Sequence, residues 1–126
     1  MLGDKEAVAT LAVKDLAAAR KFYEGVLGLA VVSANGSEAV TYKSGSSKVI
    51  VYRSQFAGTN RATAANWLVG GDIEKIAEGL KSRGVVFEHY DGLPGLTLRG
   101  DLDVAGDFKT AWFKDPDGNI LCIMNQ

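Results

Sequence analysis

The sequence has one cysteine, two prolines, one histidine and no long apolar run. A single cysteine excludes a disulfide within the chain and fits a reducing compartment. Fourteen basic residues nearly balance fifteen acidic ones, so no field of one sign favours nucleic acid or an anionic membrane. No apolar stretch reaches membrane-spanning length, and the charged start at Asp4–Glu6 is unlike a signal peptide. We therefore expect a cytoplasmic protein that binds neither nucleic acid nor membranes.

What the chain does contain is a repeated pattern. Its 126 residues, 47% of them hydrophobic, suffice for one domain with a sizeable core. An apolar strand, an aspartate at a helix start, an amphipathic helix and a terminal glycine occur twice. These landmarks are residues 7–13, Asp15 and Gly28, and then residues 64–69, Asp72 and Gly84. Such a repeat indicates two modules of the same design.

The segments between the helices complete each module. Asn35-Gly36 predicts a two-residue hairpin turn between strands 29–34 and 38–44. Gly45-Ser46 predicts the next turn, into a β-branched strand at residues 48–53. We predict an α+β fold of two βαβββ modules, about residues 1–58 and 59–126, within a single domain. Paired modules would give one curved, mostly antiparallel sheet around a cavity, with the helices outside.

The last sixteen residues predict a hairpin. Asp115-Pro116-Asp117-Gly118-Asn119 has turn chemistry, and it is followed by the apolar run 120–124. With the opening pattern of Val13-Lys14-Asp15-Leu16, Phe22-Tyr23 and Leu27-Gly28-Leu29, this chain resembles the vicinal-oxygen-chelate superfamily, the glyoxalase and bleomycin-resistance proteins. The likeness covers essentially the whole chain, and it implies the same architecture.

Alternation along the strands selects residues for the cavity wall. The selected positions are Val8, Thr10, Ile50, Tyr52, Trp112, Cys122 and Met124. Trp67 is added to this ligand-binding set, although Gly70-Gly71 leaves its register open.

The resemblance also implies a divalent metal, which many members of the family hold through His and Glu on inner strands. The matching positions here are Val8, Ala64 or Ala65, and Cys122, and the only histidine, His89, lies elsewhere. We therefore expect no metal and no cofactor.

Two further interpretations concern reactive groups. Glu88, His89 and Tyr90 form the densest titratable cluster, which indicates either general acid–base chemistry or an ordinary solvated strand end. Cys122 is either a nucleophile or a small hydrophobic residue in the middle of a strand.

Two function classes follow from these patterns. The first is a homodimeric binding protein whose aromatic cavity holds a planar or apolar small molecule, similar to the bleomycin-resistance branch. The alternative is a metal-independent lyase or isomerase acting on a small organic substrate. The Gly-rich segment 91–106 predicts a long loop, either a mobile flap over the cavity or a contact between the two chains of a dimer.

Overall fold

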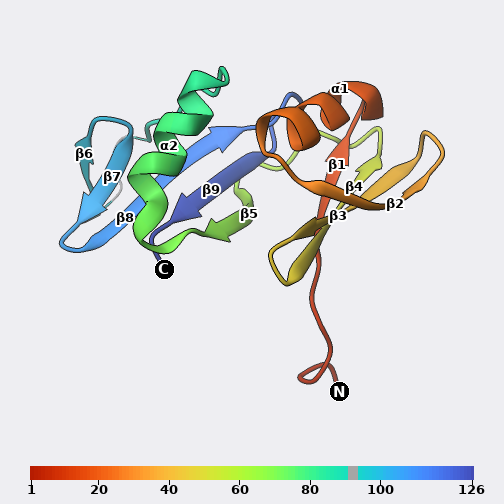
Figure 1. Ribbon diagram of the computed structural model, residues 1–126, viewed down its shortest axis with the longest axis horizontal. Coiled ribbons are helices and arrows are strands. Elements are labelled where there is room, and N and C mark those ends of the chain that lie inside the picture. Colours follow the sequence, from red (N-terminus) through yellow and green to blue (C-terminus); the bar gives the residue numbers. More distant parts are fainter. Residues whose placement is uncertain (91–93) are drawn as a thin grey trace. The chain divides into compact units, whose positions relative to one another are not determined.

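The computed structural model describes residues 1–90 and 94–126, and it contains two compact modules, Met1–Thr59 and Asn60–Gln126 (Figure 1). Each module begins with a strand and a helix and continues with further strands. The α+β class and the repeated modules are thereby confirmed. Strand pairing stays within each module, so there are a four-stranded and a five-stranded sheet where the sequence predicted one.

The first module follows the βαβββ order. Its elements are β1 (Ala9–Val13), α1 (Leu16–Arg20), a π-helical segment (Lys21–Val26), β2 (Ala30–Asn35), β3 (Ala39–Ser44) and β4 (Ser47–Arg53). The strands lie in the order β1-β4-β3-β2, and β1 runs parallel to β4. Strand ends differ from the predicted ends by one or two residues, as is usual for boundaries set from local patterns.

The start of α1 is stabilised as the sequence predicts. The Asp15 carboxylate accepts hydrogen bonds from the backbone N–H groups of Ala17, at 3.0 Å, and Ala18, at 3.2 Å. The helix then widens, because the Leu27 N–H donates to the carbonyl of Phe22, five residues earlier. Gly28 follows with a φ of 73°, a left-handed conformation that glycine adopts without strain.

The core of the first module lies between the helix and one face of the sheet. The buried residues are Leu11, Val13, Leu16, Ala19, Tyr23, Val40, Tyr42, Val49 and Val51. Tyr23 stacks on Tyr42, with ring centroids 6.1 Å apart. Because strand side chains alternate, the residues between these positions point to the opposite face.

One predicted turn is wrong and the other is confirmed. Asn35 pairs with Ala39, so residues 36–38 form a three-residue loop in place of the expected Asn35-Gly36 turn. A type I′ turn requires a positive φ at both central residues, and among the described residues only glycines have one. Gly45-Ser46 is a two-residue turn, since Ser44 pairs with Ser47.

The second module repeats this plan with one additional strand. Its elements are β5 (Thr63–Leu68), a 3₁₀ turn (Gly70–Asp72), α2 (Ile73–Ser82), β6 (Thr97–Arg99), β7 (Leu102–Ala105), β8 (Phe108–Lys114) and β9 (Ile120–Met124). The order is β5-β9-β8-β7-β6, with β5 parallel to β9. Neither helix among the described residues is long and apolar enough to cross a membrane.

Helix α2 has the predicted apolar stripe but a different start. Ile73, Ala77 and Leu80 are buried, as their spacing predicts. Asp72 does not cap the helix with its side chain, which corrects the sequence prediction. It belongs to the 3₁₀ turn, with φ −87° and ψ 9°, whereas a capping residue has an extended backbone. Gly84, at a φ of 93°, ends the helix as expected.

The predicted loop 91–106 is largely a hairpin. Residues 91–93 lie outside the described residues, but β6 and β7 pair with each other, and β7 pairs with the first half of β8. Glu88 bridges Trp112 in the second half of β8. The expectation of a structureless loop is therefore wrong for β6 and β7, whose backbone groups are paired in the sheet. Whether the segment moves stays a prediction.

The Asp115–Asn119 turn is closed by its own side chains. Asp115 accepts hydrogen bonds from the backbone N–H groups of Asp117, at 3.0 Å, and Asn119, at 2.8 Å. The Asn119 side-chain amide donates to the other carboxylate oxygen at 2.7 Å. Both Asp115 and Asn119 are buried, so the turn holds β8 and β9 in a fixed arrangement.

Candidate functional site

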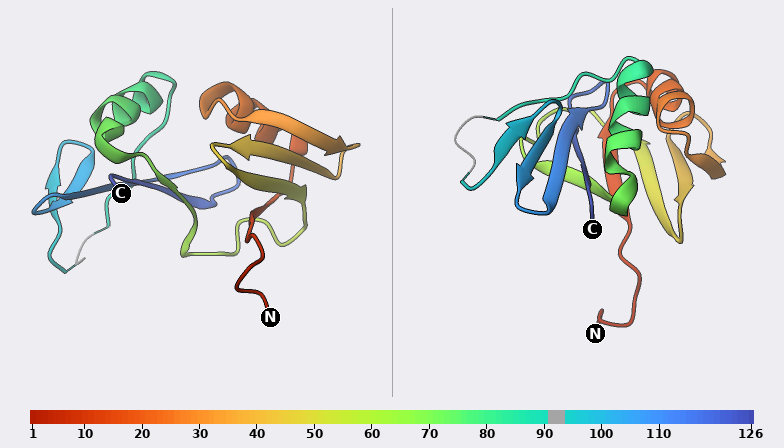
Figure 2. Two further views of the ribbon diagram at one scale, coloured as in Figure 1. Left: turned by 60° about the horizontal axis from the view of Figure 1, so that its bottom comes forward. Right: turned by 60° about the vertical axis from the view of Figure 1, so that its left-hand side comes forward.

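Each sheet packs its own helix on one face (Figure 2). The strand registers place most of the predicted ligand-binding residues on the opposite face. In the second sheet, Lys109 on β8 forms an ion pair with Glu74 on α2, which marks the side of Lys109, Ala111 and Phe113 as the helix side. Trp112 points to the other side. We call that side, with its cross-strand partners, the Trp112 face. Its members are Thr63, Asn66, Leu68, Glu88, Leu98, Asp103, Thr110, Trp112, Lys114, Ile120, Cys122 and Met124.

Trp112 is held in place on this face by two neighbours. Its indole Nε1–H donates to the hydroxyl oxygen of Thr63 on β5 at 3.2 Å. The Tyr90 ring meets it edge-on, with centroids 5.7 Å apart and an interplanar angle of 77°. Trp112 remains half-buried, so part of the indole is accessible beside a fixed aromatic partner.

An ion pair lies next to these rings. The Lys114 ammonium is 3.1 Å from the Glu88 carboxylate. Burial raises the pKa of the Tyr90 hydroxyl, and the Glu88 charge raises it further, while Lys114 opposes this. Tyr90 is therefore a neutral hydroxyl at physiological pH, able to donate a hydrogen bond.

Beside Trp112, on the same face, lies a buried polar pair. The Thr110 hydroxyl and the Cys122 sulfur are 3.1 Å apart, and the hydroxyl also lies 3.0 Å from the carbonyl of Ile123. Burial raises the pKa of the Cys122 thiol, although the hydrogen bond with Thr110 acts in the opposite direction. A neutral thiol that is only 2% exposed is a poor nucleophile, so the geometry favours the small-hydrophobe interpretation.

The first module presents its predicted residues in the same way. Thr10 pairs with Ile50, which pairs with Thr41, and Tyr52 stands in the next row, all on the face opposite the core. Tyr52 is 38% exposed, Thr10 is exposed and Ile50 is half-buried. The Thr10 hydroxyl donates to the Val8 carbonyl at 3.2 Å. Thr10, Ile50 and Tyr52 thus lie on the face without the helix, and whether a ligand binds there stays a prediction.

Trp67 does not share the face of Trp112. It pairs with Ile123 and therefore points to the helix side, while Asn66 and Leu68 pair with Cys122 and Met124. A register shift between Thr63 and Ala65 sets this alternation, and no residue type in the strand predicts it. Sequence reasoning therefore missed Asn66, whose amide lies 3.2 Å from the Met124 sulfur.

The cluster Glu88–Tyr90 is divided by the same alternation. Glu88 and Tyr90 lie beside Trp112, whereas His89 lines a separate pocket of about 460 Å³ with Lys81, Phe87 and Asp101. In that pocket Lys81 and Asp101 form an ion pair at 3.1 Å. His89 thus does not join Glu88 and Tyr90 in one catalytic arrangement.

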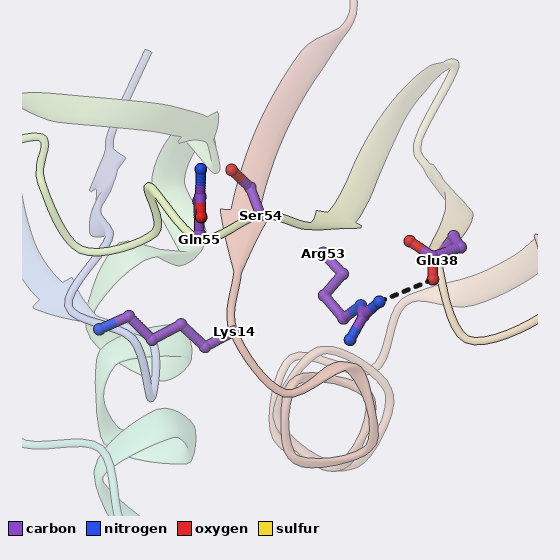
Figure 3. Close-up of a pocket in the computed structure, with 5 residues that line it drawn as sticks. All are labelled: Lys14, Glu38, Arg53, Ser54 and Gln55. Atoms are coloured by element: carbon purple, nitrogen blue, oxygen red, sulfur yellow. Dashed lines mark hydrogen bonds and ion pairs between the residues drawn. The ribbon is translucent and has the colours of Figure 1, made fainter.

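A second pocket lies at the ends of β1 and β4 in the first module (Figure 3). It has a volume of about 400 Å³ and is lined by Lys14, Glu38, Arg53, Ser54 and Gln55. The Arg53 guanidinium donates to the Glu38 carboxylate at 3.0 Å, and the two residues also share a backbone hydrogen bond of 2.8 Å. This lining is polar, so it suits an apolar ligand less well than the Trp112 face does.

The residues present do not fit the metal site that the family resemblance implies. Val8 and Ala64 have no donor atom, and the Cys122 sulfur is buried against Thr110. Within residues 1–90 and 94–126, no three His, Cys, Asp or Glu side chains gather closely enough to hold an ion. The expectation of a metal-free protein stays a prediction that metal analysis can test.

Comparison with known proteins adds a family and a fold. Residues 7–123 match the sequence model of the Glyoxalase/Bleomycin resistance protein/Dioxygenase superfamily. No curated protein matches the chain in sequence.

Several solved structures have a similar fold. A lactoylglutathione lyase from Agrobacterium tumefaciens has 17% identity and a TM-score of 0.72, over 98% of this chain and 95% of that one. The fosfomycin resistance protein FosX from Mesorhizobium loti has 17% identity and a TM-score of 0.70, over 100% and 94%. A glyoxalase family protein from Enterococcus faecalis has 20% identity and a TM-score of 0.72, over 98% and 99%. At these identities the likeness concerns the fold alone.

Proposed function

Because this chain belongs to the Glyoxalase/Bleomycin resistance protein/Dioxygenase superfamily, we propose that it is a small-molecule binding protein whose planar or apolar ligand stacks on Trp112. The observation that carries this proposal is the fixed indole on the helix-free face. Thr63 and Tyr90 hold the ring in one orientation, so a ligand need not order it on binding. A cytoplasmic location is part of the same proposal.

The surroundings of Trp112 support an apolar ligand. Met124 is half-buried and Leu68 is 66% exposed on the same face, and both add apolar surface. The Tyr90 hydroxyl and the Lys114–Glu88 pair supply polar groups at the edge. A mainly apolar surface with a few placed polar groups is the usual composition of small-molecule sites.

An enzyme of the lyase or isomerase type is the alternative. It is favoured by the position of Glu88 beside Tyr90 and Trp112, since a carboxylate and a neutral phenol could move a proton on a bound substrate. The names of two structural relatives, a lactoylglutathione lyase and a fosfomycin resistance protein, place both reactions and resistance among proteins of this fold.

Tryptophan fluorescence tests the proposal. The chain has only two tryptophans, and Trp67 lies on the helix side, so the Trp67→Phe variant leaves Trp112 as the only indole. A library of planar aromatic compounds is titrated into this variant, and a matched Trp112→Phe variant is the control. Saturable quenching in the first variant and not in the second is expected. Quenching that is equal in both variants would disprove stacking on Trp112.

A turnover assay on each hit separates the two functions. Binding without product supports the binding protein. Product formation that is lost in Glu88→Gln or Tyr90→Phe, with binding retained, supports the enzyme. Neither variant removes the indole, so binding can still be measured by its fluorescence.

A further inference from the structure

The Trp112 face contains a buried carboxylate that the proposed function does not yet use. Asp103 on β7 is 6% exposed, and one of its carboxylate oxygens, Oδ2, has no hydrogen-bond partner in the described chain. Two cross-strand neighbours flank it, Leu98 on β6 and Thr110 on β8. The Thr110 hydroxyl already interacts with Cys122 and the Ile123 carbonyl. No group among the described residues therefore donates a hydrogen bond to Oδ2.

Such a group is costly in a folded protein. A buried carboxylate oxygen without a donor loses the hydrogen bonds that water gave it and gains none. Most buried polar atoms have partners, and an exception calls for an unseen one. Lys114, the cationic residue among the members of this face, forms an ion pair with Glu88. Lys109 lies on the helix side and is engaged by Glu74.

We propose that Asp103 receives the protonated amine of the ligand whose ring stacks on Trp112. This inference rests on the proposed function and specifies its ligand class as an aromatic molecule with an alkylammonium arm. An ammonium group supplies three N–H donors and a positive charge. It would therefore give Oδ2 both a hydrogen bond and a charge partner.

The sheet register sets the length of the arm. Asp103 pairs with Thr110, and Trp112 lies two residues further along β8 on the same face. Diagonal neighbours of this kind have side chains about 7 to 8 Å apart. A flexible chain of about four carbons between ring and nitrogen spans that distance. Leu98 is the cross-strand neighbour of Asp103 on the edge strand β6 and is 49% exposed, so the arm would pass beside it.

Three matched probes test the proposal on the intact protein. Phenylbutylamine, phenylbutanol and phenylbutyrate have the same ring and chain but end in a cation, a neutral hydroxyl or an anion. Their affinities are measured by calorimetry at neutral pH for the wild type, Asp103→Asn and the control Asp107→Asn, whose exposed side chain lies outside the face. The thermal unfolding of each variant is recorded alongside.

The wild type should bind phenylbutylamine at least about tenfold more tightly than phenylbutanol, with phenylbutyrate weakest. Asp103→Asn should remove this preference, and Asp107→Asn should keep it. Equal affinity for amine and alcohol in the wild type would overturn the inference while leaving stacking on Trp112 intact. A preference that survives in Asp103→Asn would also overturn it. If Asp103→Asn fails to fold, the wild-type comparison decides alone. Absence of binding by all three probes would count against both the inference and the proposed function.

Discussion

At the scale of single residues, Asp115 does more for the fold than its place in a turn suggests. Its carboxylate accepts hydrogen bonds from two backbone N–H groups and one side-chain amide, and it is 5% exposed. Asp115→Ala leaves these donors without a partner. We expect the free energy of unfolding to fall by about 2 to 3 kcal/mol, measured by urea denaturation.

The control is Asp107→Ala, an exposed turn residue of the same type. Its effect should stay within about 0.5 kcal/mol, as for most surface substitutions. Equal losses in the two variants would contradict the role given to the buried carboxylate.

The Glu24 carboxylate gives a prediction about pH. Hydrogen bonds from Arg20, at 2.6 Å, and from the Tyr42 hydroxyl, at 2.9 Å, lower its pKa below the ordinary 4.5, against the effect of burial. A lowered pKa in the folded state means that this stabilisation is present above pH 4.5 and is lost as the pH falls through the folded pKa.

Glu24→Gln should therefore weaken the dependence of stability on pH in the acid range. Because the side chain is one-third exposed, at 33%, the difference should be below about 1 kcal/mol. Urea denaturation of wild type and variant, at neutral pH and in acid, measures it. Identical losses of stability on acidification would show that the ion pair contributes nothing.

Cys122 should be unreactive in the folded protein. Burial raises the pKa of its thiol and keeps reagents away, so a thiol-specific reagent should react with almost no sulfur in native protein and with one per chain in denaturant. Rapid labelling of the native chain would reopen the nucleophile interpretation.

At the scale of elements, the periodic segments could be predicted and the irregular ones could not. The stripe Ile73, Ala77 and Leu80 has one spacing and one physical cause, burial, so α2 was predictable. Asp72 carries a capping residue type, but the preceding 3₁₀ turn removes the extended backbone that capping needs. The residue types around Asp72 do not show whether it caps the helix or belongs to a 3₁₀ turn.

Site residues follow the same division. Trp112 was placed on the correct face because β8 and β9 alternate regularly around the Asp115 turn. The register of Trp67 stayed open, because a register shift in β5 comes from pairing with β9, a strand distant in sequence. Asp103 was overlooked because a Gly-rich stretch predicts a loop, and loops are expected to expose carboxylates.

The β6–β7 hairpin yields an element-scale prediction. Strand β7 pairs with β6 on one side and with β8 on the other, so its backbone amides are in the sheet. Amides of residues 102–105 should exchange with solvent more slowly than those of the connecting segment 59–62, in hydrogen-exchange mass spectrometry. Equally fast exchange would favour a mobile flap.

At the scale of the whole molecule, we predict a homodimer. Strand β2 is an edge strand and is exposed at every residue, including Val31 at 42% and Val32 at 51%. Exposed edges with apolar side chains favour pairing with another chain, and closed two-fold assemblies are the commonest outcome. Light scattering at micromolar concentration should give twice the chain mass. A monomer under those conditions would refute the prediction.

The way β8 pairs on its outer edge has a consequence for how ligand preference can change between related chains. Strand β8 pairs with β9 from Thr110 to Lys114, but on its other edge it pairs with β7 in one half and with Glu88 in the other. A hairpin attached only at that outer edge can lengthen, shorten or be exchanged without shifting the register of β5, β9 and β8. Substitutions and insertions at the edge that carries Asp103 could thus change the ligand preference while the pairing of β5, β9 and β8 stays the same.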